Sequence, residues 1–222
     1  MTHHIRILGT TPASNSRFVA DMTRVNKPID RLIPAGQPLF HQGNQARYVF
    51  ELRSGVLRQT RSLESGERQV IGFHFPGDLV GFSPDGVYRT GCTAITDARA
   101  LIHRTDNLTA PGRDPGLQDH MLVAAVQAIA LAQDQQVMLG RRSACAKVEA
   151  FVQFLVERSG IWCQGQLKID IPMSRYDIAD FLGLAVETVS RSLTDLRNAG
   201  VIRMDDAHRL TILRPAALAN VH

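Results

Sequence analysis

The segment PMSRYDIADFLGLAVETVSRSL, residues 172–193, has the most informative pattern in the C-terminal third of the chain. Ser174 is followed three residues later by Asp177, a spacing close to that of a capping box at the start of a short helix. Gly183-Leu184-Ala185 supplies a tight turn, and a second helix is expected over residues 186–198. The inward-facing positions of this second helix are Val189, Leu193 and Leu196. Two short helices joined by a three-residue glycine turn are typical of a helix-turn-helix.

The flanking residues complete this unit. Upstream, an amphipathic helix is expected to end near Ser159-Gly160. Downstream, Ala199-Gly200 ends the second helix, and residues 201–204 and 210–213 read as the two strands of a β-hairpin. We therefore predict a winged helix-turn-helix domain over residues 141–222.

The outward face of the second helix carries the chemistry. Glu187, Ser190 and Arg191 lie near its N-terminus, the end that faces base edges in the major groove. Arg191 can donate two hydrogen bonds to guanine O6 and N7, and Glu187 can accept one from cytosine N4. On spacing alone, the two residues fit an exposed ion pair of ~0.3–0.5 kcal/mol equally well, but the surrounding cap, turn and hairpin favour DNA contact. Arg175, at the start of the first helix, fits either a phosphate contact or a solvated surface arginine.

Residues 30–104 consist of short apolar runs separated by turns rich in Gly and Pro. Turn signals recurring roughly every 8–12 residues are typical of an all-β sandwich or barrel. We assign residues 1–116 to an N-terminal β-barrel domain and expect the first thirty residues to wrap around it. The candidate strands are 48–52, 56–62, 69–75 and 99–103.

Residues 117–140 read as one long helix with two apolar faces. One face is a coiled-coil-like seam of about three heptads, formed by Leu117, Met121, Ala124, Ala128, Leu131 and Met138. The other is a stripe formed by Leu122, Val126 and Ile129. Two apolar faces need two partners, so we expect the barrel to cover one face and a second copy of the chain to pack on the seam. The alternative is a single helix buried inside one domain.

Composition limits the function further. The chain has 222 residues and a formal net charge of +4, which permits nucleic-acid binding without requiring it. The longest nearly apolar stretch, residues 121–132, is too short to span a bilayer, and the N-terminus lacks a signal peptide's apolar core. We therefore expect a cytoplasmic protein with no membrane partner. No Gly-rich phosphate loop, His-Glu metal motif or nucleophile elbow occurs, so we expect no enzyme activity, no catalytic residue and no metal.

The stretches 139–144, 147–151, 172–184 and 186–191 together resemble the CRP/FNR superfamily of bacterial transcription regulators, most closely its FNR/FixK branch. The resemblance extends over about residues 30–215, and its C-terminal motifs are the specific ones. It implies an α+β fold with a cyclic-nucleotide-binding-like jelly-roll β-barrel, a long dimerisation helix and a winged helix-turn-helix. It also implies a homodimeric activator that binds double-stranded DNA and recruits RNA polymerase.

FNR-like members read a TTGAT half-site with the pattern Glu-x-x-Ser-Arg, and the palindrome continues with ATCAA across a four-base spacer. This pattern is intact at residues 187–191. The resemblance implies Arg191 on the guanine, Glu187 on its partner cytosine, Ser190 beside the flanking thymines and Val186 on a thymine methyl group. Phosphate contacts are assigned to Arg175, Thr188 and Ser174.

The resemblance also raises the question of a sensor. An iron–sulfur cluster needs four thiolates, whereas this chain has three well-separated cysteines and none near the N-terminus. These are Cys92, Cys145 and Cys163, whose scatter fits reduced thiols in the cytosol. A cyclic-nucleotide site is half-built, because Arg89 is present but Phe82 follows Gly81 where cAMP binders have Glu.

Haem needs an axial ligand, and His41, His74 and His103 are candidates without a spacing signature. FixK-type regulators lack a cluster and are commonly controlled by their own synthesis, which fits this chain best, so no cofactor is expected. The alternative is an effector-gated receptor switched by cAMP, by haem or nitric oxide, or by thiol chemistry at Cys145 or Cys163. Buried, inert cysteines are the interpretation that we favour for these thiols.

Overall fold

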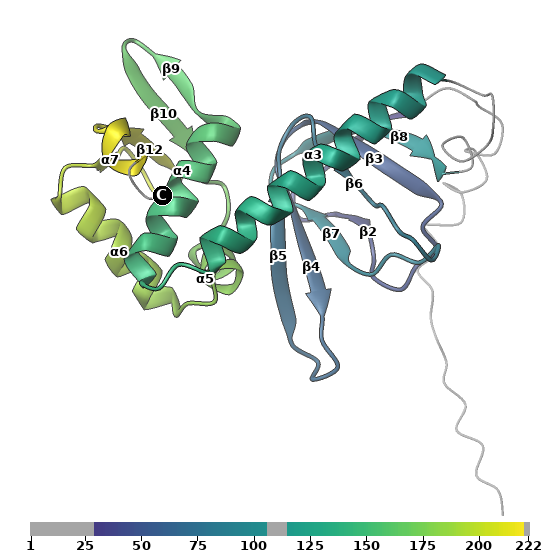
Figure 1. The fold of residues 1–222 in the computed structure, drawn as a ribbon, viewed down its shortest axis with the longest axis horizontal. Helices are drawn as coiled ribbons and strands as arrows, with labels where there is room; N and C mark the ends of the chain where they lie inside the picture. The colour runs from purple at the N-terminus through teal and green to yellow at the C-terminus, as the bar shows by residue number, and fades with distance from the viewer. Residues whose placement is uncertain (1–28, 106–114, 220–222) are drawn as a thin grey trace, which may run out of the picture.

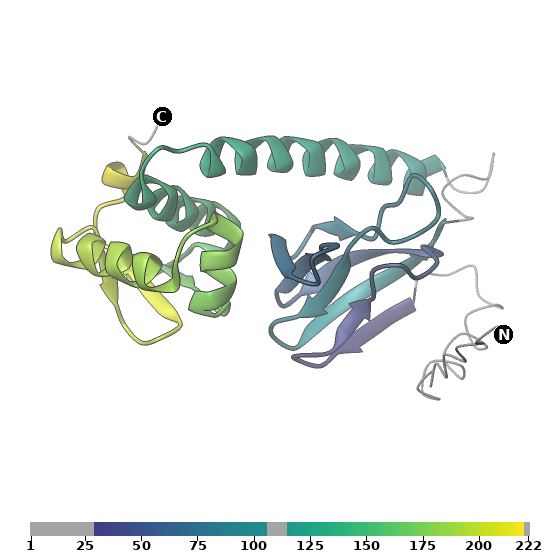
Figure 2. The same cartoon turned by 90° about the horizontal axis from the view of Figure 1, so that it is seen from below.

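The computed structural model describes residues 29–105 and 115–219 of the chain. The first thirty residues are expected to wrap around the barrel, and of these only residues 29 and 30 are among the described residues. Figure 1 shows a β-barrel domain and a mainly helical C-terminal domain joined by the long helix α3 (Pro115–Leu139). Figure 2 shows both domains on the same side of α3.

Two four-stranded antiparallel sheets form the N-terminal domain, as the turn spacing predicted. Their strand orders are β1-β8-β3-β6 and β2-β7-β4-β5. The core between them contains Leu52, Leu57 and Ile102. Each of the four candidate strands matches an observed strand to within two residues. The strands are β1 (Ile29–Ile33), β2 (Pro38–Phe40), β3 (Tyr48–Ser54), β4 (Leu57–Ser62), β5 (Arg68–His74), β6 (Leu79–Val80), β7 (Gly91–Ala94) and β8 (Ala98–Arg104).

The coiled-coil-like seam of α3 is predicted to be a dimer interface, and three of its described residues pack against their own chain. Met121 and Ala124 are only 6% and 9% exposed, because they pack with Val49 and Leu79 of the barrel. Met138 is buried in the core of the C-terminal domain. Side chains covered by their own chain have no surface left for a second copy.

The other seam positions lie between these two contacts. Ala128 and Leu131 are half-buried and line a cavity between α3 and the barrel. The side chain of Leu117 is outside the described part of the structure. The opposite stripe of α3 is exposed and apolar, with Leu122 at 65% and Ile129 at 61%.

By length and composition alone, residues 118–139 of α3 are also long and apolar enough to cross a membrane. This segment is longer than the apolar stretch at 121–132 that the sequence suggested was too short. Its barrel-facing side carries Gln127, Asp134 and Gln135 at the cavity, and its C-terminal end contacts the next helix. In this fold, α3 therefore packs along the barrel on one side and contacts the C-terminal domain at its end.

The C-terminal domain combines helices with a small sheet of order β11-β12-β10-β9. Helix α4 begins at the cap Ser143, whose hydroxyl accepts a hydrogen bond from Ala146 N, and ends as predicted at Ser159-Gly160. The helices are α4 (Ala144–Ser159), α5 (Arg175–Leu182), α6 (Val186–Asn198) and α7 (Pro215–Ala219). The strands are β9 (Ile161–Cys163), β10 (Gln166–Asp170), β11 (Ile202–Met204) and β12 (Arg209–Ile212). Together, α5, α6 and the β11–β12 hairpin form the predicted winged helix-turn-helix.

The two domains share one hydrophobic core. Val70 and Phe73 of β5 are buried in the same cluster as the inner faces of α4 and α5. The Phe73 ring centroid lies 5.3 Å from that of Phe181 on α5 and 6.0 Å from that of Phe151 on α4. This packing places the helix-turn-helix directly against the barrel.

Candidate DNA-binding site

The first helix of the helix-turn-helix is fixed by its cap and its turn. The Ser174 hydroxyl accepts a hydrogen bond from Asp177 N (3.1 Å) and donates one to Asp177 Oδ2 (2.8 Å). At the other end, Gly183 adopts φ +63°, a left-handed conformation that glycine tolerates best. This turn lets Leu184 N donate to Ala179 O (2.9 Å) and redirects the chain into α6.

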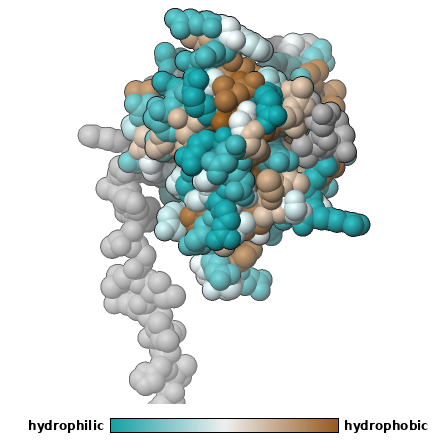
Figure 3. Space-filling view, turned by 90° about the vertical axis from the view of Figure 1, so that its left-hand side faces the viewer, coloured by the Kyte–Doolittle hydropathy of each residue, from teal (hydrophilic) through white to brown (hydrophobic). Residues whose placement is uncertain are grey.

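Helix α6 is amphipathic, and its core face sets which side chains reach solvent. Val189, Leu193 and Leu196 are buried, as the sequence spacing predicted. The exposed residues in its N-terminal half are Glu187, Ser190 and Arg191, and Thr194 follows one turn later. The face of the molecule that the C-terminal domain forms is largely hydrophilic, with smaller apolar groups between (Figure 3).

The charged tips of this exposed face are not engaged with each other. Within the described part of the chain, no ion pair joins Glu187 to Arg191, although they lie one helical turn apart. Ser190 Oγ donates to Val186 O (3.0 Å) and Thr194 Oγ1 to Ser190 O (3.0 Å), which fixes both hydroxyls on the helix. Among the described residues no side chain caps α6 at Ala185, so its first N–H groups are available to an anion such as a phosphate. The helix thus presents a donor fork, a carboxylate and an uncapped N-terminus together.

Arg175 and Ser174 differ in what they can offer a phosphate. Arg175 is half-buried, and burial lowers the pKa of its guanidinium. Its Nη1 is buried and has no hydrogen-bond partner among the described residues, so this atom would have to turn outward to meet a phosphate. The Ser174 hydroxyl already donates its proton to Asp177, so it has no donor left for a phosphate oxygen. In this structure Ser174 therefore caps α5, and its phosphate contact stays a prediction.

Two further predicted contacts are only partly accessible. Val186 and Thr188 are half-buried, and Val186 packs against the C-terminal core. Tyr176, the second residue of α5, is 75% exposed beside Arg175 and was not singled out from the sequence. The sequence did contain a sign of it, because a large aromatic residue stands second in the first helix of the predicted helix-turn-helix.

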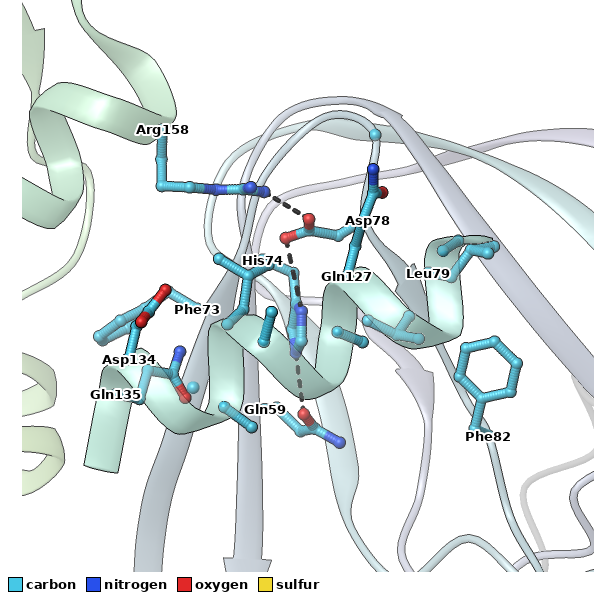
Figure 4. A pocket seen from close by; sticks show the side chains of 18 of the residues that line it. Gln59, Phe73, His74, Asp78, Leu79, Phe82, Gln127, Asp134, Gln135 and Arg158 are labelled. Carbon is cyan, nitrogen blue, oxygen red and sulfur yellow. Dashed lines mark hydrogen bonds and ion pairs between the residues drawn. The ribbon is translucent and has the colours of Figure 1, made fainter. Parts of the chain in front are cut away.

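A cavity of about 720 Å³ lies between β5, the following loop and α3 (Figure 4). His74 and Asp78 project into it, and His74 Nε2 lies 2.8 Å from Gln59 Oε1. Arg158 of α4 reaches across from the C-terminal domain to Asp78. Burial opposes ionisation of Asp78, but hydrogen bonds from His74 and Phe75 N and the charge of Arg158 lower its pKa overall. Residues of both domains therefore line the cavity.

Most of the sensor residues considered from the sequence do not meet in this cavity. Phe82 lines it, whereas Arg89 is exposed and donates to Asp85 (2.9 Å), lowering the pKa of that carboxyl to about 2. His41 is exposed, and His103 is buried 3.4 Å from Glu51, where burial lowers the histidine's pKa. No cluster of metal-ligating side chains occurs in the described residues.

The three thiols have different surroundings. Burial raises the pKa of Cys92 to about 12. Burial, and to a smaller extent the hydrogen bond with Glu149, raises the pKa of Cys145 to about 11. Cys163 is exposed on β9, in contrast to the expectation of a buried thiol.

Comparison with known proteins agrees with this geometry. Residues 149–221 match the Crp-like helix-turn-helix domain, and residues 30–110 match the cyclic nucleotide-binding domain. The nitrogen fixation regulation protein FixK of Rhizobium meliloti is 34% identical over 214 residues, which cover 96% of this chain and 92% of that protein. The transcriptional activatory protein AadR of Rhodopseudomonas palustris is 38% identical over 168 residues, 75% of this chain and 70% of AadR.

A solved structure shows the same fold. The structure of FixK2 from Bradyrhizobium japonicum superposes with a TM-score of 0.77 at 28% identity, covering 87% of this chain and 96% of that one. The relatives are transcription regulators and not enzymes. The chain therefore belongs to the CRP/FNR family of DNA-binding transcription regulators, and it is FixK-like.

Proposed function

We propose that this protein is a cytoplasmic transcription activator that binds the palindrome TTGAT-N4-ATCAA as a homodimer, without a cofactor. The observation that carries the proposal is the exposed N-terminal face of α6, where Glu187 and Arg191 form no ion pair with each other. A guanidinium and a carboxylate one turn apart match a guanine and the cytosine paired with it. The names of FixK and AadR support a regulator of the same kind.

Base and phosphate contacts have separate roles in this proposal. Arg191 donates to guanine O6 and N7, Glu187 accepts from cytosine N4, and Ser190 with Val186 contacts thymine. Arg175, the first residue of α5, and the uncapped N-terminus of α6 hold phosphates, which supply affinity and register without reading sequence.

The second copy of the chain packs on the exposed stripe of α3. Leu122, Val126 and Ile129 are each more than half exposed and lie on one side of the helix. A two-fold axis along this stripe places one α6 in each of two successive major grooves. The dimer then recruits RNA polymerase from the DNA, with no contact to a membrane.

A salt-controlled binding titration in air, without added ligand, tests the proposal. The probes are a TTGAT-N4-ATCAA duplex and the same duplex with both guanines replaced, each at two salt concentrations. We expect tight binding that depends on the guanines. Equal affinity for the two duplexes would contradict the assigned reader.

An effector-gated receptor is a second candidate, which the cavity at His74 and Asp78 favours. Such a receptor binds the palindrome only after cAMP, haem or nitric oxide occupies the cavity, or after oxidation of a thiol. Thermal stabilisation by cAMP, or a haem absorption band in the purified protein, supports it over cofactor-free binding.

A further inference from the structure

We propose that Arg58 of the barrel is a positioning residue for DNA recognition. Through its ion pair with Asp177 in the first turn of α5, it fixes the orientation of the helix-turn-helix and hence the spacing between the two half-sites that a dimer reads. The inference about spacing rests on the proposed binding of a palindrome by a homodimer.

The β4–β5 hairpin holds both acidic side chains of α5. Arg58 Nη1 lies 2.5 Å from Asp177 Oδ1, and these side chains are only 20% and 9% exposed. Arg68 Nη2 lies 3.7 Å from the same oxygen. One turn further along α5, Asp180 Oδ2 accepts a hydrogen bond from Val70 N (2.8 Å). We call these contacts, made by Arg58, Arg68 and Val70 to Asp177 and Asp180, the barrel clamp.

Asp177 joins the clamp to the cap of the helix. Its Oδ2 accepts from the Ser174 hydroxyl, while its Oδ1 faces Arg58. Arg58 Nε has no partner among the described residues, so Asp177 is the main anchor of this guanidinium. Removal of one member of a buried ion pair leaves an uncompensated charge, so the two residues are expected to act as a unit.

The orientation of α5 is passed to α6. The two helices are joined by the three-residue turn at Gly183 and pack against each other. Figure 1 shows the C-terminal domain connected to α3 by a short segment, residues 140–143, and Met138 at the end of α3 is buried in the core of that domain. In a dimer, the recognition helices must lie about one DNA turn, roughly 34 Å, apart. Rotation of the helix-turn-helix about this segment would change that distance, and the barrel clamp opposes it together with the shared hydrophobic core.

The test compares the full-length Arg58→Gln, Asp177→Asn and double variants. Arg61→Gln is the matched control, because Arg61 is exposed on the same strand. Hydrogen exchange of the Val70 amide, measured without DNA, reports directly on the clamp, since this amide donates to Asp180 across the interface. We expect faster exchange at Val70 in the two single variants and wild-type exchange in Arg61→Gln.

The second measurement is affinity for half-sites separated by three, four or five bases. We expect the preference for the four-base spacer to fall about two- to a hundredfold in each single variant, with little further loss in the double variant. Arg58→Lys, which retains the charge, is expected to restore part of this preference.

Wild-type spacer preference in Arg58→Gln would overturn the proposal, whether or not Val70 exchanges faster. If Asp177→Asn unfolds through loss of the cap, Arg58→Gln and Arg68→Gln carry the test, because both leave Ser174 and Asp177 intact. If the wild-type protein shows no guanine-dependent binding, the proposed function fails. The exchange measurement then still shows whether Arg58 holds the clamp.

Discussion

Asp78 of the barrel and Arg158 of α4 form an ion pair that connects the two domains at the edge of the cavity. Both side chains are mostly buried, and the Arg158 guanidinium carbon lies 5.6 Å from the centroid of the Phe75 ring. His74 lies on the other side of the same carboxylate (Figure 4). The pair is therefore shielded from solvent on several sides, so its loss should measurably lower the free energy of unfolding.

Replacing Asp78→Asn should lower the free energy of unfolding at pH 7 by about 1–3 kcal/mol, because Arg158 loses its charged partner. The folded-state pKa of Asp78 is below its usual value of 3.8, so its contribution is present above about pH 4 and is lost as the pH falls. The difference between wild type and variant should therefore shrink on acidification. Urea unfolding across a pH series measures it.

Asp85→Asn is the control for this prediction, because Asp85 pairs with Arg89 at an exposed site. Surface ion pairs contribute little, so the control should change stability much less. Equal effects of the two substitutions would contradict the assignment of Asp78–Arg158 as a connection between the domains.

Arg191→Ala should lower discrimination at the guanine of the half-site by about 1–3 kcal/mol. The comparison is the ratio of affinities for the cognate duplex and for the guanine-substituted one. Arg197→Ala is the matched control, since Arg197 is exposed in the last turn of the same helix. A wild-type ratio in Arg191→Ala would remove the base contact from the proposal.

Ile129→Asp should dissociate the proposed dimer. Burial of one isoleucine contributes about 1.5–3 kcal/mol, and a two-fold interface contains the change twice, so the dimer dissociation constant should rise about a hundredfold or more. Sedimentation analysis over a concentration series measures this constant. Gln127→Asp places the same charge on an exposed polar position of α3 that lies on the cavity side, away from the stripe, and should leave the dimer intact. A dimer unaffected by Ile129→Asp would show that the stripe is not the interface.

The thiols should differ in reactivity. Cys163 should be alkylated first, because it is exposed. In a Cys163→Ser variant, Cys145 should react slowly and about tenfold faster for each pH unit between 7 and 9, because only its thiolate reacts and its pKa is about 11. Mass spectrometry of the modified peptides measures both rates. A Cys145 rate that is independent of pH would contradict the raised pKa.

The helix-turn-helix could be predicted from the sequence because its determinants are local. The cap of Ser174 on Asp177 and the left-handed turn at Gly183 each involve residues within a few positions of one another. The exposed position of Arg191 follows from the buried Val189 and Leu193 on the opposite side of the same helix.

The orientation of α3 could not be predicted in this way. Periodicity identified two apolar stripes, but Met121 and Ala124 are chemically similar to Val126 and Ile129, so the pattern does not say which stripe the barrel covers. The structure shows Met121 beside Val49 and Leu79. The barrel clamp was also not predicted, because Arg58 and Asp177 are 119 positions apart and no sequence motif contains both residues. Two acids one turn apart on α5 were the only local sign of it.

The ring cluster of Phe73, Phe151 and Phe181 has a consequence for how such regulators diversify. The predicted boundary of the C-terminal domain follows residue 140, but these rings belong to one core that includes the barrel. A C-terminal domain transferred alone to another barrel would therefore expose Phe151 and Phe181 to water. Exchange of whole DNA-reading modules between relatives is therefore constrained unless β5 is inherited with them. The exposed face of α6 is free of this core, so under the proposed mode of binding new operator sequences can be acquired by changing a few surface residues while the shared face of the two domains stays the same.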